Sequence, residues 1–432
     1  MSKKSNMASI VLALIVLLTA CIGSTGIVLA ADSPNPVSYF GEMVVNGNRI
    51  NGSKTGQPMQ VKGMSFFWSN WSGPYYNAST VDRMIDEFKV EIVRVAYGVT
   101  DGGTPYNTSD EAKLRTVIEA AINRGIYVII DWHSHGAHDN VDAAKDFFGR
   151  MAQDYGSYDN VIFEIYNEPK QIPWSTVKWY AEQVIPVIRQ HSNNLIVVGS
   201  PTWSQDVDQA ANDRIQADNI AYTLHFYAGT HFQYLRDKAN YAMNQGLALF
   251  CTEWGSVNAD GNGSINYNST NEWLTWLDQN KISWCNWAIN DKDETSSIFY
   301  SDGSLREAGT FLKSIFLAWV PYQEWRDGSP NPNPTENITF AVKDDWGTGF
   351  NGIITIHNTS SSPIKNWTLA FDFEGQIDSF WTANLISHSG NNYVINGKDY
   401  NATIQAGESI QLGFTATASS QITPTNYVLT GN

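Results

Sequence analysis

The sequence has few charged residues, few cysteines and no excess of positive charge. Only 16% of its 432 residues are charged and 42% are hydrophobic, which predicts a globular chain rather than a disordered one. Acidic residues outnumber basic ones by 43 to 27, giving a formal net charge of -16. This charge argues against nucleic acid and against an anionic membrane as partners. The length allows two domains and a large core.

Only the N-terminal region carries a long apolar run. Lys3 and Lys4 precede an apolar stretch at residues 8–20, which is short for a membrane span. We therefore expect a secretion signal over residues 1–30 and a secreted, extracellular protein. An alternative reading is a lipoprotein signal ending at Cys21, which would anchor the protein at the cell surface; otherwise no membrane partner is expected.

Cleavage after residue 30 would leave two cysteines. Cys251 and Cys285 both lie inside apolar runs that have the pattern of buried strands. Buried free thiols behave as small apolar side chains, whereas an exported protein can also form a disulfide. Both readings stay open at this point.

Apolar runs alternate with amphipathic stretches through most of the chain. A small hairpin comes first, with its turn at Asn46-Gly47-Asn48. Strands are expected at residues 61–65, 90–97, 126–133, 161–168, 195–199, 220–227, 247–253 and 283–288. Helices are expected from a cap at Ser79-Thr80 through Phe88, and at residues 111–123, 142–155, 176–189, 206–216, 233–244, 272–280 and 305–315.

Eight strands alternating with helices predict an α/β fold of the (β/α)8, or TIM barrel, type. A doubly wound open sheet is the main rival. No glycine-rich phosphate-binding fingerprint follows the first expected strand, which disfavours that rival. We place the barrel domain at residues 38–322.

The composition changes after the barrel. Residues 327–336 form a proline-rich linker, which predicts a semi-rigid, extended segment. In residues 337–432 no helical pattern is visible, and turn residues separate short apolar runs. Strands are expected there at residues 338–342, 352–357, 367–373, 393–395, 400–404 and 410–417. This pattern predicts a small all-β sandwich domain.

Two carboxylates occupy the ends of expected strands. The apolar run at residues 161–166 ends at Asn167-Glu168-Pro169, because Pro169 cannot donate a ladder hydrogen bond. Glu253 has the same kind of place in the seventh expected strand. The carboxyl ends of parallel strands are where α/β folds carry their chemistry.

Such a carboxylate pair, without a Ser-His-Asp signature or metal-ligand spacing, indicates paired acid/base work. Carboxyl groups about 5–5.5 Å apart suit a retaining glycosidase, in which one protonates the leaving oxygen and the other attacks the anomeric carbon. The sixteen tryptophans also favour sugar binding, since apolar sugar faces stack on rings. A non-catalytic polysaccharide-binding protein is the alternative from another class, although it would not need both carboxylates.

In chain order the motifs at the strand ends read VKGMS, IVRV, IIDWHS, IFEIYNEP, TWSQDV, LHFYAGT, TEWG and WCNW. They resemble glycoside hydrolase family 5, most of all its bacterial-type endo-β-1,4-glucanases (cellulases). The resemblance implies a (β/α)8 barrel that hydrolyses internal bonds of cellulose and related β-glucans by double displacement. No metal or organic cofactor is implied, and a monomer is expected. A β-mannanase or xyloglucanase of the same family is the nearest alternative.

The resemblance also assigns catalytic roles. Glu168 matches the acid/base and Glu253 the nucleophile. Asn167 matches the residue that hydrogen-bonds the sugar 2-hydroxyl. Arg94 and Tyr227 match the groups that hold and polarise the nucleophile.

Further positions match residues that line the family's cleft. His225 matches the residue beside the acid/base, His133 a sugar contact at the cleavage subsite, and Trp287 the platform under that sugar. The remaining cleft residues implied are the platforms Trp71 and Trp203 and the loop pair Lys292 and Glu294.

Some neighbouring residues are given structural interpretations. Asp131 is expected to be a buried structural acid, and His135 a structural or cleft-rim residue. Trp132 and Trp284 are expected in the core. Close relatives carry a His after the Gly-Met-Ser segment, where this chain has Phe66 or Phe67.

Residues 337–432 resemble a family 2 carbohydrate-binding module. The matching segments are DWGTGF, ITIHNT, NWTL, DSFW, AGE and LGFT. The resemblance implies cellulose binding through three exposed rings, Trp346, Trp381 and Tyr400, with Trp367 in the core. The terminal disulfide common in such modules is missing, because this part of the chain has no cysteine.

Overall fold

The computed structural model describes residues 34–326, 338–358, 363–418 and 422–431. The expected secretion signal with Cys21, the linker at 327–336 and residue 337 lie outside the described residues. Among the helices that are described, none is long and apolar enough to cross a membrane.

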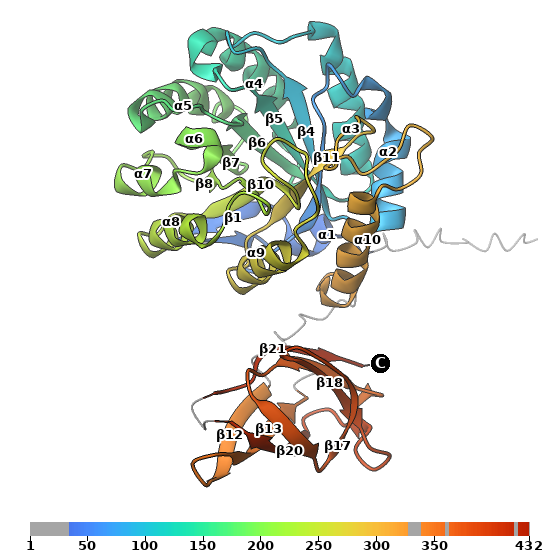
Figure 1. The fold of residues 1–432 in the computed structure, drawn as a ribbon. Helices are drawn as coiled ribbons and strands as arrows, with labels where there is room; N and C mark the ends of the chain where they lie inside the picture. Colours follow the sequence, from blue (N-terminus) through green and yellow to red (C-terminus); the bar gives the residue numbers. More distant parts are fainter. Residues whose placement is uncertain (1–33, 327–337, 359–362, 419–421, 432) are drawn as a thin grey trace, which may run out of the picture. The chain divides into compact units, whose positions relative to one another are not determined.

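A closed parallel barrel forms the larger folded region (Figure 1). Around it run β3 (Lys62–Phe66), β4 (Ile92–Gly98), β5 (Tyr127–His133), β6 (Val161–Tyr166), β7 (Ile196–Val198), β8 (Ile220–Thr223) with β9 (Phe226–Tyr227), β10 (Leu249–Gly255) and β11 (Trp284–Ile289). The parallel pairing of β11 with β3 closes the ring. Closure rules out the doubly wound sheet and confirms the predicted (β/α)8 barrel.

One expected strand is interrupted. Residues 220–227 were expected to be continuous, but β8 ends at Thr223 and β9 begins at Phe226. The break occurs because the backbone N–H of His225 donates to Ser204 O, at 2.9 Å, instead of joining the ladder.

Helices occupy the connections between the strands and surround the barrel (Figure 1). They are α2 (Ala78–Arg83), α3 (Glu111–Asn123), α4 (Val141–Tyr155), α5 (Trp174–Ile188), α6 (Pro201–Ser204), α7 (Val207–Asn212), α8 (Gln233–Asn244), α9 (Tyr267–Gln279) and α10 (Glu307–Trp319). The predictions for α3 and α8 are confirmed to the residue. The helix expected at 206–216 is wrong in length, because only α7 forms there.

The first barrel helix begins earlier than expected. The side chain of Asn77 accepts a hydrogen bond from the backbone N–H of Thr80, so Asn77 is the N-cap. The prediction of a Ser79-Thr80 cap is therefore wrong, and both residues lie inside α2. A π-helical turn, η2 (Met84–Phe88), extends α2 to Phe88.

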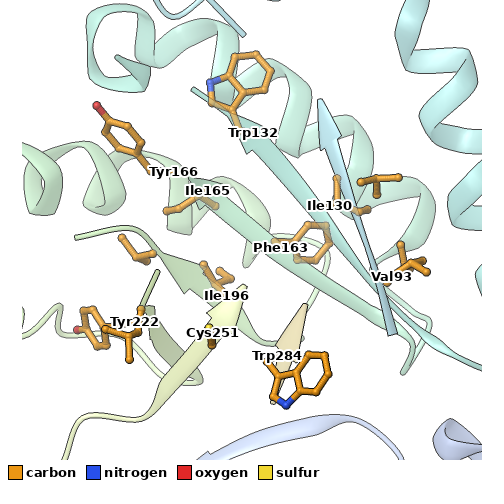
Figure 2. Close-up of a cluster of buried hydrophobic side chains, with 14 of the residues drawn as sticks. Val93, Ile130, Trp132, Phe163, Ile165, Tyr166, Ile196, Tyr222, Cys251 and Trp284 are labelled. Atoms are coloured by element: carbon orange, nitrogen blue, oxygen red, sulfur yellow. The ribbon is translucent and has the colours of Figure 1, made fainter. Parts of the chain in front are cut away.

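Strand residues of the barrel are buried on both faces, which explains their continuous apolar runs. Figure 2 shows Trp132, Phe163, Ile165 and Trp284 among the buried side chains. The core placement of both tryptophans is confirmed. Cys251 and Cys285 are buried free thiols, which settles the choice left open by the sequence.

The N-terminal end of the barrel is closed by a short helix and a hairpin. The helix is α1 (Pro36–Phe40), and the hairpin pairs β1 (Met43–Asn46) with β2 (Arg49–Gly52), as predicted. Phe40, Met43 and Ile50 pack with strand residues such as Ile92 in one buried cluster. The opposite, carboxyl end of the strands is left for the loops that carry the candidate site.

The C-terminal region is all β, as predicted. One antiparallel sheet has the order β12 (Ile338–Asp345), β13 (Phe350–His357), β20 (Ser409–Thr417) and β16 (Gln376–Phe380). The other has the order β17 (Ala383–Ser389), β18 (Asn392–Gly397), β15 (Thr368–Asp372) and β21 (Thr425–Thr430). A short pair, β14 (Ile364–Lys365) with β19 (Thr403–Ile404), completes the described strands. Both sheets contribute to one apolar core, so the fold is a sandwich.

Candidate active site

Glu168 and Glu253 meet at the carboxyl end of the barrel. Glu168 follows the end of β6, and Glu253 lies near the end of β10. One carboxylate oxygen of each, together with a ring nitrogen of His225, lie within 4.8 Å of one another. This spacing fits carboxyl groups about 5–5.5 Å apart, the retaining arrangement, and not the 6.5–9.5 Å of inverting enzymes.

Glu253 is buried and held by two donors. Nη1 of Arg94 donates to Oε2 at 3.0 Å, and the Tyr227 hydroxyl donates to Oε1 at 2.7 Å. Burial and the nearby charge of Glu253 raise the pKa of Tyr227 well above its ordinary value, so the phenol keeps its proton and remains a donor. Arg94 and Tyr227 therefore lie where the resemblance expects them.

Arg94 is fully buried and contacts three carboxylates. Its Nε donates to Oε2 of Glu164 at 2.7 Å, and its Nη2 lies 2.9 Å from Oδ2 of Asp131, in addition to the contact with Glu253. Burial lowers the pKa of Arg94, but the three carboxylates outweigh this and raise it well above the ordinary value. Burial raises the pKa of Asp131 to about 7. The expectation that Asp131 is a buried acid agrees with these contacts.

Asn167 lies next to this ion cluster. Its Oδ1 accepts from Nη2 of Arg94 at 2.5 Å, which fixes the orientation of the amide. The Nδ2 group is buried and has no hydrogen-bond partner among the described residues. An unpaired buried donor is costly, so this amide is suited to donate to a bound ligand.

Glu168 lies between two histidines. Nδ1 of His225 is 2.8 Å from Oε1, and Nε2 of His135 is 3.3 Å from Oε2. Burial raises the pKa of Glu168, but the hydrogen bonds of His135 and His225 outweigh it and hold the pKa below its ordinary value. The interpretation of His135 as a structural or cleft-rim residue does not include this contact with Glu168.

His133 and Trp287 form an aromatic floor. Their rings stack with a centroid separation of 5.1 Å and an interplanar angle of 5°. Nδ1 of His133 lies 2.6 Å from Oδ2 of Asp131, and burial lowers the pKa of His133 well below its ordinary value, so the ring is neutral. Phe67 also packs on Trp287, at 5.1 Å, whereas Phe66 is fully buried. Phe67 is thus the one of these two residues that contacts the aromatic floor.

The remaining predicted cleft residues lie on loops that follow barrel strands. Trp71 follows β3 and is 72% exposed, and Trp203 follows β7 and is 38% exposed. In the loop after β11, Nζ of Lys292 pairs with Oε2 of Glu294 at 2.5 Å. Nζ of Lys292 also lies 5.4 Å from the ring centre of Phe67, which brings the loop pair next to the aromatic floor.

A left-handed turn at Thr202, Trp203 and Ser204 was not anticipated. All three residues have φ between 55° and 58°, which is rare for residues other than glycine. Oγ of Ser204 donates to the backbone oxygen of Asn167 at 2.7 Å, and its own carbonyl accepts from His225 N–H. The turn therefore ties the segment that carries Glu168 to the segment that carries His225.

The residues that could hold a cation in the described part of the chain are Glu168, His225 and Glu253. Each already has protein partners: His225 bonds to Glu168, and Arg94 and Tyr227 bond to Glu253. The donor set thus fits acid/base work by carboxylates.

In the C-terminal sandwich, the three rings expected to bind cellulose are exposed. Trp346 is 52%, Trp381 39% and Tyr400 71% exposed. Trp367 is buried in the core, as predicted. Tyr400 lies in a turn before β19, because the strand expected at 400–404 is shortened to its last two residues.

The chain is similar to known families and proteins. The family model described as cellulase (glycosyl hydrolase family 5) matches residues 53–293, over half of the chain, and that of a cellulose binding domain matches residues 336–432. Endoglucanase Z of Dickeya dadantii is 42% identical over 392 residues, which cover 89% of this chain and 91% of that protein. An endoglucanase of Clostridium saccharobutylicum is 40% identical over 292 residues, 64% of this chain and 65% of that protein.

Solved structures are also similar to this chain. A structure from Cytophaga hutchinsonii has a TM-score of 0.63 at 42% identity, covering 67% of this chain and 98% of that one. The catalytic domain of Thermobifida fusca endoglucanase Cel5A has a TM-score of 0.62 at 30% identity, covering 66% of this chain and 99% of that one. The chain therefore belongs to glycosyl hydrolase family 5 and carries a cellulose binding domain in addition.

Proposed function

We propose that this endo-β-1,4-glucanase hydrolyses internal bonds of cellulose with Glu253 as the nucleophile and Glu168 as the acid/base. One observation carries the proposal: the two carboxylates approach within 4.8 Å, but one is bound by an arginine and the other by two histidines. Glu253 is bound by the cation of Arg94 at 3.0 Å and by the hydroxyl of Tyr227 at 2.7 Å. Glu168 is bound by two histidines, which can exchange a proton with it.

These partners support a double displacement. In the first step, Glu253 attacks the anomeric carbon, the glycosidic bond breaks, and the proton of Glu168 passes to the leaving oxygen. In the second step, Glu168 takes a proton from water, the water oxygen attacks the same carbon, and the bond to Glu253 breaks. Arg94 and Tyr227 stabilise the charge that returns to Glu253 as the bond breaks.

The neighbouring groups support a sugar site beside the carboxylates. The unpaired Nδ2 of Asn167 is the donor we assign to the sugar 2-hydroxyl, a contact that strengthens in the transition state. Trp287 and His133 supply the floor under the cleaved sugar. Trp71, Trp203, Lys292 and Glu294 extend the site along the glucan chain.

The exposed rings of the sandwich support attachment to insoluble cellulose. Trp346, Trp381 and Tyr400 present apolar faces to solvent, and glucose rings stack on such faces. We propose a division into a secretion signal at 1–30, a catalytic domain at 38–322, a linker at 327–336 and a binding module at 337–432. A protein built this way works outside the cell as a monomer, on polysaccharide that cannot enter it.

The catalytic proposal is tested with the variants Glu253→Ala and Glu168→Ala on carboxymethyl cellulose, with Glu182→Ala, an exposed carboxylate on α5, as the control. Glu253→Ala should lose all turnover while still binding cellulose, and Glu182→Ala should match the parent. Proton NMR should show the β-anomer as the first product. Turnover by Glu253→Ala, an α-anomer as first product, or faster cleavage of galactomannan or xyloglucan would each contradict the proposal.

A further inference from the structure

A chain of buried hydrogen bonds connects Glu168 to Arg94 through His225, Thr252 and Glu164. We propose that Thr252 and Glu164 are positioning residues that fix the tautomer of His225, so that its Nδ1 lone pair accepts the proton carried by the Glu168 carboxyl group. The inference rests on the acid/base role proposed above for Glu168.

The direction of each hydrogen bond follows from the donors available. Both oxygens of Glu164 accept from Arg94, Oε2 from Nε at 2.7 Å and Oε1 from Nη2 at 3.2 Å, so Glu164 acts as an acceptor. Oγ1 of Thr252 donates its hydrogen to Oε1 of Glu164 at 2.7 Å. A hydroxyl group has only one hydrogen. The contact of 2.9 Å between Thr252 Oγ1 and His225 Nε2 therefore requires the hydrogen on Nε2.

This assignment determines what Nδ1 can do. A neutral imidazole that carries its hydrogen on Nε2 has a lone pair on Nδ1. That atom lies 2.8 Å from Oε1 of Glu168, so the contact is a hydrogen bond only if Glu168 supplies the proton. The lowering of the Glu168 pKa described above is the effect of a histidine ring that donates. In the Nε2–H tautomer the ring of His225 accepts instead, and it stabilises the protonated carboxyl group that the first catalytic step needs.

Burial prevents water from replacing this arrangement. Thr252 and Glu164 are fully buried, and His225 is nearly so. Without the Thr252 hydroxyl, His225 is free to carry its hydrogen on Nδ1 and donate to an ionised Glu168. That tautomer favours the form of Glu168 that cannot act as an acid.

Substituting Thr252 leaves the other ionisable side chains around the pair in place. His135 bonds to the second oxygen of Glu168 and is itself influenced by Asp101 and Lys170. The other titratable or charged groups that face Glu168 or His225 are Arg94, Asp131, His133, Glu164, Tyr227, His231 and Glu253. A change confined to Thr252 therefore reports on the tautomer of His225.

The test compares Thr252→Val, which removes the hydroxyl at nearly constant shape, with Thr252→Ser, which retains it. Two substrates are used: phenyl β-cellobioside, whose leaving group needs a proton, and 2,4-dinitrophenyl β-cellobioside, whose leaving group does not. For Thr252→Val, kcat/KM should fall about tenfold on the phenyl substrate and stay unchanged on the dinitrophenyl substrate. In its pH profile of kcat/KM on the phenyl substrate, the alkaline limb should move about one pH unit toward acid. Thr252→Ser should keep the kcat/KM and the pH profile of the parent protein.

Equal losses on both substrates, no loss on either, or a Thr252→Ser variant as impaired as Thr252→Val would overturn the proposal. Nitrogen-15 NMR of histidine-labelled parent protein gives a second answer that needs no Thr252 variant. With the resonance assigned by comparison with His225→Gln, the Nε2–H tautomer is expected, and the Nδ1–H tautomer would contradict the proposal.

The proposed function is tested separately by Glu168→Ala on the same two substrates. If kcat/KM of Glu168→Ala falls only on the phenyl substrate and that of Thr252→Val does not fall, the acid/base role stands and the positioning role is rejected. If kcat/KM of Glu168→Ala falls equally on both substrates, the acid assignment itself fails.

Discussion

Gly413 in β20 is the residue on which the indole ring of Trp381 lies. A Cβ atom at position 413 would stand 2.4 Å from Cε3 and 3.0 Å from Cζ3 of Trp381. Carbon atoms in ordinary contact are about 3.5–4 Å apart, so Gly413→Ala would lift the ring by roughly 1 Å. The ring is held by a hydrogen bond from its Nε1 to Oγ1 of Thr415 at 3.2 Å, which lifting would break. We therefore expect this variant to lose Trp381 as a flat stacking surface.

The expected magnitude follows from the value of one aromatic contact. Ring stacking contributes about 0.5–1.5 kcal/mol beyond area burial, which corresponds to about twofold to tenfold in affinity. The fold should tolerate the change, because Gly413 lies in a strand and has no left-handed φ that only glycine would adopt. Loss of cellulose affinity without loss of stability is therefore the expected result for Gly413→Ala.

Binding isotherms of the full chain on microcrystalline cellulose provide the assay, with turnover of soluble carboxymethyl cellulose measured in parallel. Ile386→Ala is a matched control, because it removes an exposed apolar side chain from β17 in the other sheet. Gly413→Ala should bind cellulose more weakly and keep its turnover, and Ile386→Ala should match the parent in both. An unchanged isotherm for Gly413→Ala, or an equal loss for Ile386→Ala, would refute the role of Trp381.

Two further variants test a buried carboxylate of the barrel and the left-handed turn beside the site. Glu91 accepts indole N–H groups of Trp319 and Trp325 on different oxygens, at 2.8 and 2.6 Å, so Glu91→Gln should leave one indole without an acceptor. The free energy of unfolding should fall by about 1–3 kcal/mol in urea titrations, and an unchanged midpoint would count against this. Ser204→Ala removes the hydrogen bond to Asn167 O and should lower kcat on cello-oligosaccharides by about twofold to tenfold, with little change in KM. An unchanged kcat would show that the left-handed turn does not position Asn167 and Glu168.

The order of the barrel elements could be predicted from the sequence, because each one has a local cause. Buried parallel strands produce continuous apolar runs, and surface helices produce a repeat near 3.6 residues, so the bounds of α3 and α8 were found to the residue. Strands β14, β16, β17 and β21 of the sandwich were missed. Their sequences, such as QIDSF in β16, are short and largely polar, and they form strands only through pairing with distant segments.

The carboxylate pair and its immediate partners also had local signals, since each stands at a strand end in a family motif. His135 and the turn at residues 202–204 did not, because their roles come from contacts across the barrel. Ser204 contacts Asn167 from the connection after another strand. The sequence Pro-Thr-Trp-Ser does not predict three successive left-handed residues. Such contacts follow from tertiary structure and not from propensity.

Thr252 and Glu253 are neighbours in β10, yet both reach the site. Along β10, Phe250 lies in the buried cluster inside the barrel and Cys251 in the cluster under the helices. Alternation therefore directs Thr252 into the barrel and would direct Glu253 away from it. The pairing of β10 with β11 shifts register between Cys251 and Trp254, and such irregularities redirect side chains near active sites. Glu253 can then reach Arg94 and Tyr227 while Thr252 reaches Glu164 and His225. One irregularity in one strand thus brings the nucleophile into the same site as the residue that orients the partner of the acid/base.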